Sequence, residues 1–157
     1  DEQAKDKDPF AGWNVILIEK NPNIPREGKG KTVGGRKQIE ANQTPEQYLK
    51  LLQTAKQYAN EQGLTLEDWL TQFLVYLEKT NQVIDDYAGK GSACYLLASF
   101  NKIARALGCG YWCQYKNQAG LRGSNPEHQF DPIGCRAAVG VGKVDKVPMG
   151  SLRGLIS

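Results

Sequence analysis

The sequence lacks long apolar stretches and is poor in histidine and methionine, with one residue of each among 157. Its apolar runs are short, as at residues 15–18, whereas a helix that spans a bilayer needs roughly 20 apolar residues. We therefore expect no membrane span. Because His128 is the only histidine, a zinc site would depend on the cysteines, of which only Cys109 and Cys113 are close in sequence. We expect neither a metal nor another cofactor.

The chain also lacks an initial methionine, and its first residues, DEQAKD, contain no apolar targeting region. We therefore expect a processed chain or a piece of a longer one. If a leader was removed, the protein is secreted or periplasmic, and its four cysteines could form two disulfides.

The composition is that of an ordinary globular protein, with 40% hydrophobic and 24% charged residues. The length suits a single domain over residues 1–157. Within it, the charged residues 1–9 are expected to form a frayed lead-in, and the Gly-rich, basic residues 20–43 a mobile loop.

Charge is unevenly distributed along the chain. Residues 90–157 carry nine Lys/Arg and three Asp/Glu, a net charge of +6, whereas residues 38–89 carry three and eight, a net charge of −5. A basic segment of this kind attracts polyanions through long-range electrostatics, but its charge density is modest. We expect at most weak, salt-sensitive binding to RNA or DNA.

The hydrophobic spacing predicts three helices, at residues 45–62, 66–80 and 93–107. Each follows a residue that commonly caps helices, and each carries an apolar stripe at helical spacing. The capping residues are Thr44, Thr65 and Ser92.

Short extended segments flank these helices. A strand is predicted at residues 12–19, and further strands at 109–116, 127–130 and 135–144, with a turn at 131–134 joining the last two. This order predicts an α+β fold, in which three helices pack on one face of a small antiparallel sheet and the N-terminal strand joins the C-terminal strands. The oligomeric state stays open.

Cys94 is the candidate nucleophile. In the predicted helix 93–107 it lies in the first turn, where the helix dipole and free backbone N–H groups would lower the pKa of its thiol. A nucleophilic cysteine also needs a base, and His128 follows at the start of a predicted strand. The adjacent Asp85 and Asp86 are interpreted as solvated or capping acids.

The sequence GKGSACYLLA at residues 89–98, the Leu-Gly pair at 107–108 and His128 resemble the core of transglutaminase-like proteins within the papain-like cysteine enzyme superfamily. The resemblance covers residues 89–145. It implies a hydrolase or acyl transferase acting on peptide or amide bonds of a peptide or protein substrate. In that mechanism Cys94 attacks the carbonyl, His128 transfers the proton, and Asp145 or Asp131 orients the imidazole.

Two alternatives remain from the residues alone. One is a metal-independent ribonuclease, in which His128 works with basic residues of the C-terminal part, namely Lys116, Arg122 or Arg136. The other is a secreted binding or assembly subunit without catalysis, stapled by two disulfides among Cys94, Cys109, Cys113 and Cys135.

Overall fold

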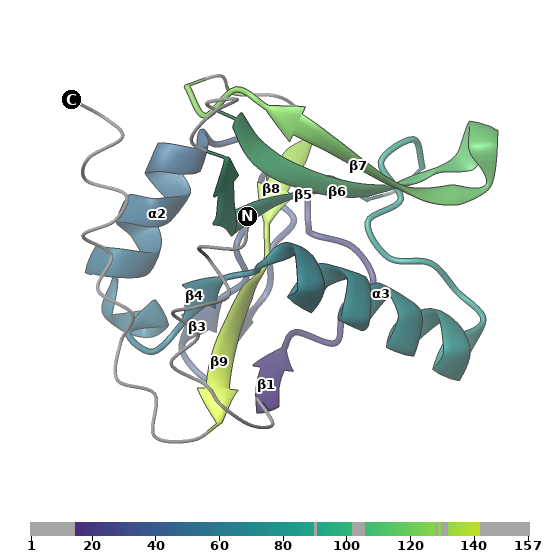
Figure 1. Ribbon diagram of the computed structural model, residues 1–157. Helices are drawn as coiled ribbons and strands as arrows, with labels where there is room; N and C mark the ends of the chain where they lie inside the picture. The colour runs from purple at the N-terminus through teal and green to yellow at the C-terminus, as the bar shows by residue number, and fades with distance from the viewer. Residues whose placement is uncertain (1–14, 90, 102–105, 128, 130–131, 142–157) are drawn as a thin grey trace.

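The structure, a computed structural model, describes residues 15–89, 91–101, 106–127, 129 and 132–141. Within these residues the fold is α+β, with two α-helices, a four-stranded sheet and a three-stranded sheet (Figure 1). The α+β class predicted from the sequence is confirmed. Neither described helix is long and apolar enough to cross a membrane.

The four-stranded sheet has the order β7-β6-β5-β8. β5, β6 and β7 are antiparallel neighbours, whereas β8 runs parallel to β5. The strands are β5 (Ala93–Asn101), β6 (Ala106–Cys113), β7 (Gln118–Ser124) and β8 (Ile133–Cys135).

The three-stranded sheet has the order β1-β9-β4, with β9 (Ala137–Val141) between β1 (Val15–Ile18) and β4 (Gln62–Gly63). The N-terminal strand therefore pairs with a C-terminal strand, as predicted. Only Arg136 separates β8 from β9, so one continuous segment links the two sheets.

Both helices begin at the caps expected from the sequence. The hydroxyls of Thr44 and Thr65 accept hydrogen bonds from the third residue of each helix, and each helix returns a side-chain bond to its cap. α3 (Leu66–Thr80) matches its predicted range. α2 (Pro45–Thr54) is shorter than predicted, because the chain changes there to a single 3-10 turn, η1 (Lys56–Tyr58).

The two helices pack on opposite faces of the four-stranded sheet, not on one face as predicted. Tyr48 of α2 contacts Tyr95 of β5, with ring centroids 6.2 Å apart. Trp69 of α3 lies against Gly110 of β6, whose partner in β5 is Cys94. Neighbouring residues of a strand point to opposite faces, so Tyr95 and Cys94 face different helices. The sheet therefore lies between two cores.

The prediction of a helix at residues 93–107 is wrong, because the described residues of this segment, 93–101 and 106–107, form β5 and the start of β6. Every residue from 93 to 97 is buried, since both faces of the strand are covered. A strand buried on both faces reads as a continuous apolar run, which periodicity cannot distinguish from a buried helix. Ser92 does not cap a helix and instead donates a hydrogen bond to the carbonyl of Ile24.

Three smaller expectations also need correction. Residues 20–43 contain a hairpin of β2 (Thr32–Val33) and β3 (Arg36–Lys37) and contribute Ile24 and Ile39 to the cores, so they are not a bare loop. Glu127, in the predicted strand 127–130, lies in a turn. Residues 133 and 134, assigned to a turn, belong to β8.

Candidate functional site

Cys94 lies in the middle of the molecule, on the α3 side of β5, and is fully buried. Burial raises the pKa of its thiol well above the usual value, and the nearby carboxylate of Asp85 raises it further. The prediction of a low-pKa thiol at a helix start is therefore wrong. The thiol is sealed in a hydrophobic core, where it has no access to a substrate.

The remaining members of the predicted catalytic set, His128, Asp131 and Asp145, lie outside the described residues. Their pairing with Cys94 stays a prediction. The side-chain amide of Gln114 donates to the carboxylate of Asp86 at 2.9 Å.

The interpretation of Asp85 as a solvated acid is wrong. Asp85 is fully buried and forms an ion pair with Arg136 at 2.7 Å, while the indole of Trp69 donates to the same carboxylate at 2.8 Å. Arg136 also donates to the carbonyls of Asn21 and Pro22. Arg136 is therefore committed to the core and is not available as the phosphate clamp of a ribonuclease.

All four cysteines are free thiols, so the two predicted disulfides are absent. Cys94, Cys109 and Cys135 are buried, and burial raises the pKa of the Cys109 thiol to about 11. Among the described residues, no cluster of three or more His, Cys, Asp or Glu side chains could hold a metal ion.

The structure instead forms an apolar groove between α3 and β7. Leu66 of α3 and Leu121 of β7 form its two walls, and Leu96 and Ser99 of β5 contribute to its lining. The cavity has a volume of about 270 Å³ and is wide open to solvent. We call it the α3–β7 groove. Sequence reasoning did not identify it.

Glycines create the groove. Gly108 of β6 and Gly123 of β7 pair with each other and leave this part of the sheet without side chains. Two residues further along β6, on the same face of the sheet, Gly110 lies under Trp69, where an added Cβ would meet the indole at 2.6 Å. Because Gly110 has no side chain, α3 can approach β6 closely. Because Gly108 and Gly123 also have none, the space beside this contact stays empty.

The helix wall is longer than the cavity. Leu66, Leu70 and Leu74 are four residues apart, so they lie along one flank of α3. Leu74 is exposed and Leu66 and Leu70 are half-buried. The opposite wall carries Leu121, which is 48% exposed. Large apolar side chains therefore line both walls of a feature that is open to water.

The strand wall is also the edge of the sheet. In the strand order β7-β6-β5-β8, β7 pairs only with β6 among the described residues. Along its outer edge, the backbone N–H and C=O groups that do not bond to β6 have no strand to pair with in the part of the chain that the structure describes. An apolar wall and a row of backbone donors and acceptors thus lie side by side.

The opposite face of β7 carries a separate cluster. The guanidinium of Arg122 lies over the rings of Tyr87 and Tyr111, 5.6 and 5.5 Å from their centroids. These contacts hold the Arg122 side chain away from the groove, because Arg122 pairs with Cys109 and so faces the α2 side of the sheet.

No protein-family model, curated protein or solved structure matches this chain. The resemblance to transglutaminase-like proteins therefore stays a prediction. The sequence did hold a signal for the groove, in the glycines at 108, 110 and 123, which occur in strands where side chains are expected.

Proposed function

We propose that this chain is a binding module that takes up an extended, apolar peptide segment of a partner protein in the α3–β7 groove. The peptide adds to the free edge of β7 as a further strand and places side chains against the flank of α3. The observation that carries the proposal is the open apolar groove beside an unpaired strand edge.

A peptide suits the groove better than a compact small molecule. Its cavity of about 270 Å³ lies below the range of about 300–1,000 Å³ that is common for small-molecule pockets, and it is open to solvent. The side chains that line it are mostly apolar and supply few polar contacts that would fix a small ligand. The edge of β7 supplies the hydrogen bonds through its backbone, and a peptide backbone is the natural partner for them.

The dimensions of the two walls agree. α3 has 15 residues and β7 has seven. At about 1.5 Å per helical residue and about 3.3 Å per strand residue, both walls extend for roughly 22 to 23 Å. The groove therefore accommodates an extended segment of about six or seven residues.

The geometry also sets the sequence pattern of the ligand. Side chains of an added strand alternate between the two faces of the sheet, so every second residue of the peptide meets α3. We expect large apolar residues at alternate positions, with the strongest preference opposite Leu66 and Leu121. Small or polar residues are tolerated between them, because those positions face away from α3.

The test begins with a library of random heptapeptides displayed on phage and selected on the wild-type protein. The recovered sequence is then synthesised with a fluorescent label and titrated by anisotropy. In the Gly123→Val variant the new side chain occupies the groove, and Gly123 has no positive φ that would strain the substitution. We expect its dissociation constant to rise roughly tenfold or more.

Val75→Lys is the matched control, because Val75 is exposed on α3 about half a turn away from Leu66 and Leu77. It should bind like the wild type. Leu121→Asn provides a second test, because it removes apolar contact area from the β7 wall and should weaken peptide binding. Leu121 is about half exposed, so the change should be tolerated by the fold. Selected peptides without alternating apolar residues, or peptides that bind Gly123→Val as tightly as the wild type, would contradict the proposal.

A further inference from the structure

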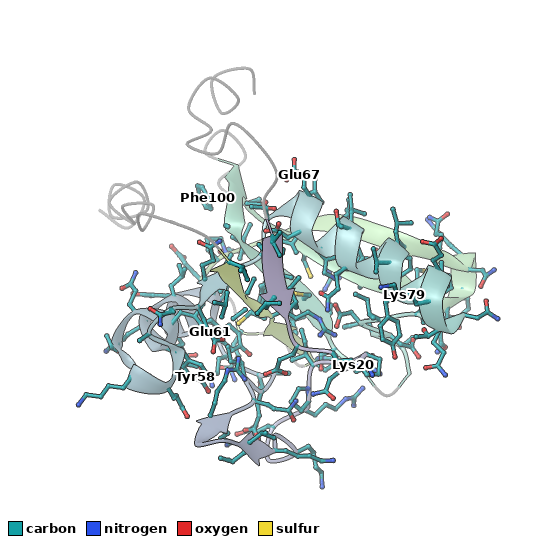
Figure 2. The ribbon with its side chains drawn as sticks, turned by 90° about the horizontal axis from the view of Figure 1, so that it is seen from below. Lys20, Tyr58, Glu61, Glu67, Lys79 and Phe100 are labelled. Atoms are coloured by element: carbon teal, nitrogen blue, oxygen red, sulfur yellow. The ribbon has the colours of Figure 1, made fainter. Side chains whose placement is uncertain are left out.

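A second unpaired strand edge lies on the other side of α3. β1 forms one edge of the three-stranded sheet and pairs only with β9 among the described residues. Figure 2, seen from below, shows β1 at the front of the molecule. The side-chain amide of Gln72 in α3 donates to the carbonyl of Glu19 just after β1, whereas Leu66 borders the groove on the opposite flank. The two edges are therefore separate surfaces.

The outward face of β1 and β9 is an exposed apolar patch. Val15 pairs with Val141, and Leu17 pairs with Val139, so all four side chains lie on one face of the sheet. Val15 is 56% exposed, Leu17 61% and Val141 53%. We call these residues the β1–β9 patch. The face toward α3 carries Ile16 and Ile18, which are half-buried in the core.

β1 is a short edge strand of four residues whose side chains carry no device against pairing. Its sequence, Val-Ile-Leu-Ile, contains no charge, no proline and no glycine. Edge strands of soluble monomers usually carry lysine, proline or a bulge that blocks pairing with another chain. An uncharged and mostly β-branched edge beside an exposed apolar face favours pairing with a further strand.

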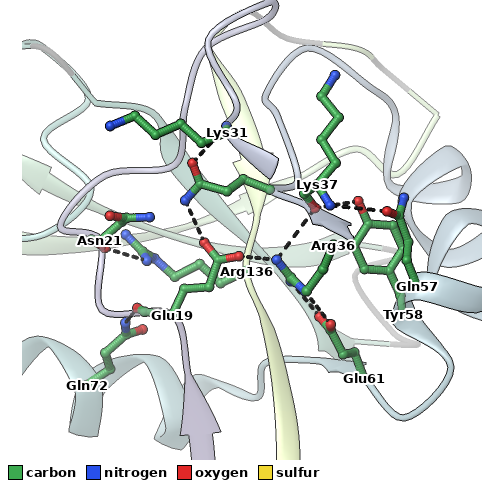
Figure 3. Close-up of polar contacts among 11 residues, drawn as sticks. Glu19, Asn21, Lys31, Arg36, Lys37, Gln57, Tyr58, Glu61, Gln72 and Arg136 are labelled. Atoms are coloured by element: carbon green, nitrogen blue, oxygen red, sulfur yellow. Dashed lines mark hydrogen bonds and ion pairs between the residues drawn. The ribbon is translucent and has the colours of Figure 1, made fainter. Parts of the chain in front are cut away.

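The charged residue that follows β1 is held in place. The carboxylate of Glu19 forms an ion pair with Arg36 and accepts a hydrogen bond from the Gln38 amide at 3.1 Å (Figure 3). Arg36 also binds Glu61, which precedes β4. The negative charge of Glu19 is thus compensated within the same molecule, so it does not repel a second strand beside β1.

We propose that two copies of this chain associate through their β1 strands, which pair antiparallel across a twofold axis. The two three-stranded sheets then form one sheet of six strands, and the β1–β9 patches of both copies become continuous. A second copy fits this edge because the strand is its own complement, with four uncharged apolar residues and no like charges opposite one another.

The alternation of side chains restricts the register. Directly opposite residues of antiparallel strands lie on the same face, so one residue must face its own copy, with the twofold axis midway between the two. In β1 that residue is Ile16 or Leu17. The register centred on Ile16 places Val15 of each copy opposite Leu17 of the other, so that the exposed apolar side chains cover one another.

The test is sedimentation equilibrium of the full chain over a wide range of protein concentration. The wild type is expected to form a dimer of twice 17.4 kDa that dissociates on dilution. Leu17→Lys places a charge in the centre of the patch and should raise the dimer dissociation constant roughly tenfold or more. Val33→Lys is the matched control, because Val33 is 74% exposed and belongs to the β2–β3 hairpin, outside the β1–β9 strand pair. It should leave the dimer unchanged.

Val15→Lys is measured in parallel, and circular dichroism establishes that each variant is folded. Loss of the dimer in both edge variants, with the control dimeric, supports the proposal. A wild type that stays monomeric at all concentrations overturns it, whether the patch is covered by other residues of the chain or by a different partner. Larger open assemblies also overturn it, because a twofold contact closes after two copies.

Discussion

Asp85 is the most deeply buried charge of the described residues, and Arg136 is the residue that compensates this charge. It has a positive φ of 53° and is fully buried, with its carboxylate shared between Arg136 and the indole of Trp69. Removing one member of a buried pair leaves the other charge without compensation, which typically costs about 3–5 kcal/mol.

We therefore expect Arg136→Met to lower the free energy of unfolding by about 3–5 kcal/mol, measured by urea denaturation. Lys37→Met is the control, because it removes an ion pair with Glu40 in which Lys37 is about half exposed. Such surface pairs contribute roughly 0–1 kcal/mol. A loss at Arg136 no larger than that at Lys37 would show that the buried pair does not stabilise the fold.

The cysteines differ in burial, and their reactivity should follow. Cys113 is half-buried, whereas Cys94, Cys109 and Cys135 are buried. Burial raises the pKa of the Cys94 thiol well above its usual value and that of Cys109 to about 11, so neither forms much thiolate near neutral pH.

We expect iodoacetamide to modify Cys113 first in the native protein at about pH 8, and the buried three only after unfolding. Raising the pH to about 9 should leave Cys109 largely protonated and unmodified, because its pKa is about 11. Peptide mass mapping distinguishes the sites. Modification of Cys94 as fast as Cys113 at neutral pH would reinstate Cys94 as a candidate nucleophile.

At the scale of elements, the contact between α3 and β6 determines whether the groove exists. Trp69 lies on Gly110, and Phe73 stacks on Trp112 with centroids 5.9 Å apart. An added Cβ at Gly110 would lie 2.6 Å from the indole of Trp69, so the helix or the ring must move.

Gly110→Ala is therefore expected to destabilise the protein by about 1–3 kcal/mol, because it overpacks this contact. Gly108→Ala is the comparison, since its Cβ would meet the end of the Leu96 side chain at 3.2 Å, which can adjust more easily. Thermal unfolding followed by circular dichroism measures both. Equal and small effects would mean that α3 is not held against β6 at Gly110.

The elements also show which structure was accessible from the sequence. α3 was predicted correctly, because its cap at Thr65 and its apolar stripe are both local signals. β5 was not, because residues 93–97 are apolar at every position and the segment ends in Leu-Gly, which resembles a helix end. The error placed Cys94 at the start of a helix, whereas the structure buries it in a strand. The candidate nucleophile was therefore lost with the helix.

The groove was not predictable for a different reason. Its walls come from α3 and β7, and its floor depends on the pairing of Gly108 with Gly123. That pairing follows from the register of the β6–β7 hairpin. The sequence predicts a strand at 109–116 but none at the position of β7. A site formed by nonlocal strand pairing can be predicted only when the sheet topology is known, whereas helix caps and apolar stripes can be recognised from local sequence.

For the whole molecule, the net charge of +3 predicts weak binding of polyanions at most. Arg136 is one of the basic residues of the C-terminal part, and its charge is compensated by Asp85 in the core. We expect the protein to elute from immobilised heparin below physiological salt. Retention well above that salt would indicate a nucleic-acid-binding surface and would favour the ribonuclease alternative.

The central claim is that β7 accepts a peptide strand in the α3–β7 groove, and amide hydrogen exchange followed by NMR tests it most directly. With a selected heptapeptide at saturation, the β7 amides that do not bond to β6 should exchange roughly tenfold more slowly, because they gain hydrogen-bond partners. The methyl resonances of Leu66 and Leu121 should shift, while the β1 amides should not change. Tight peptide binding without added protection in β7 would contradict the account.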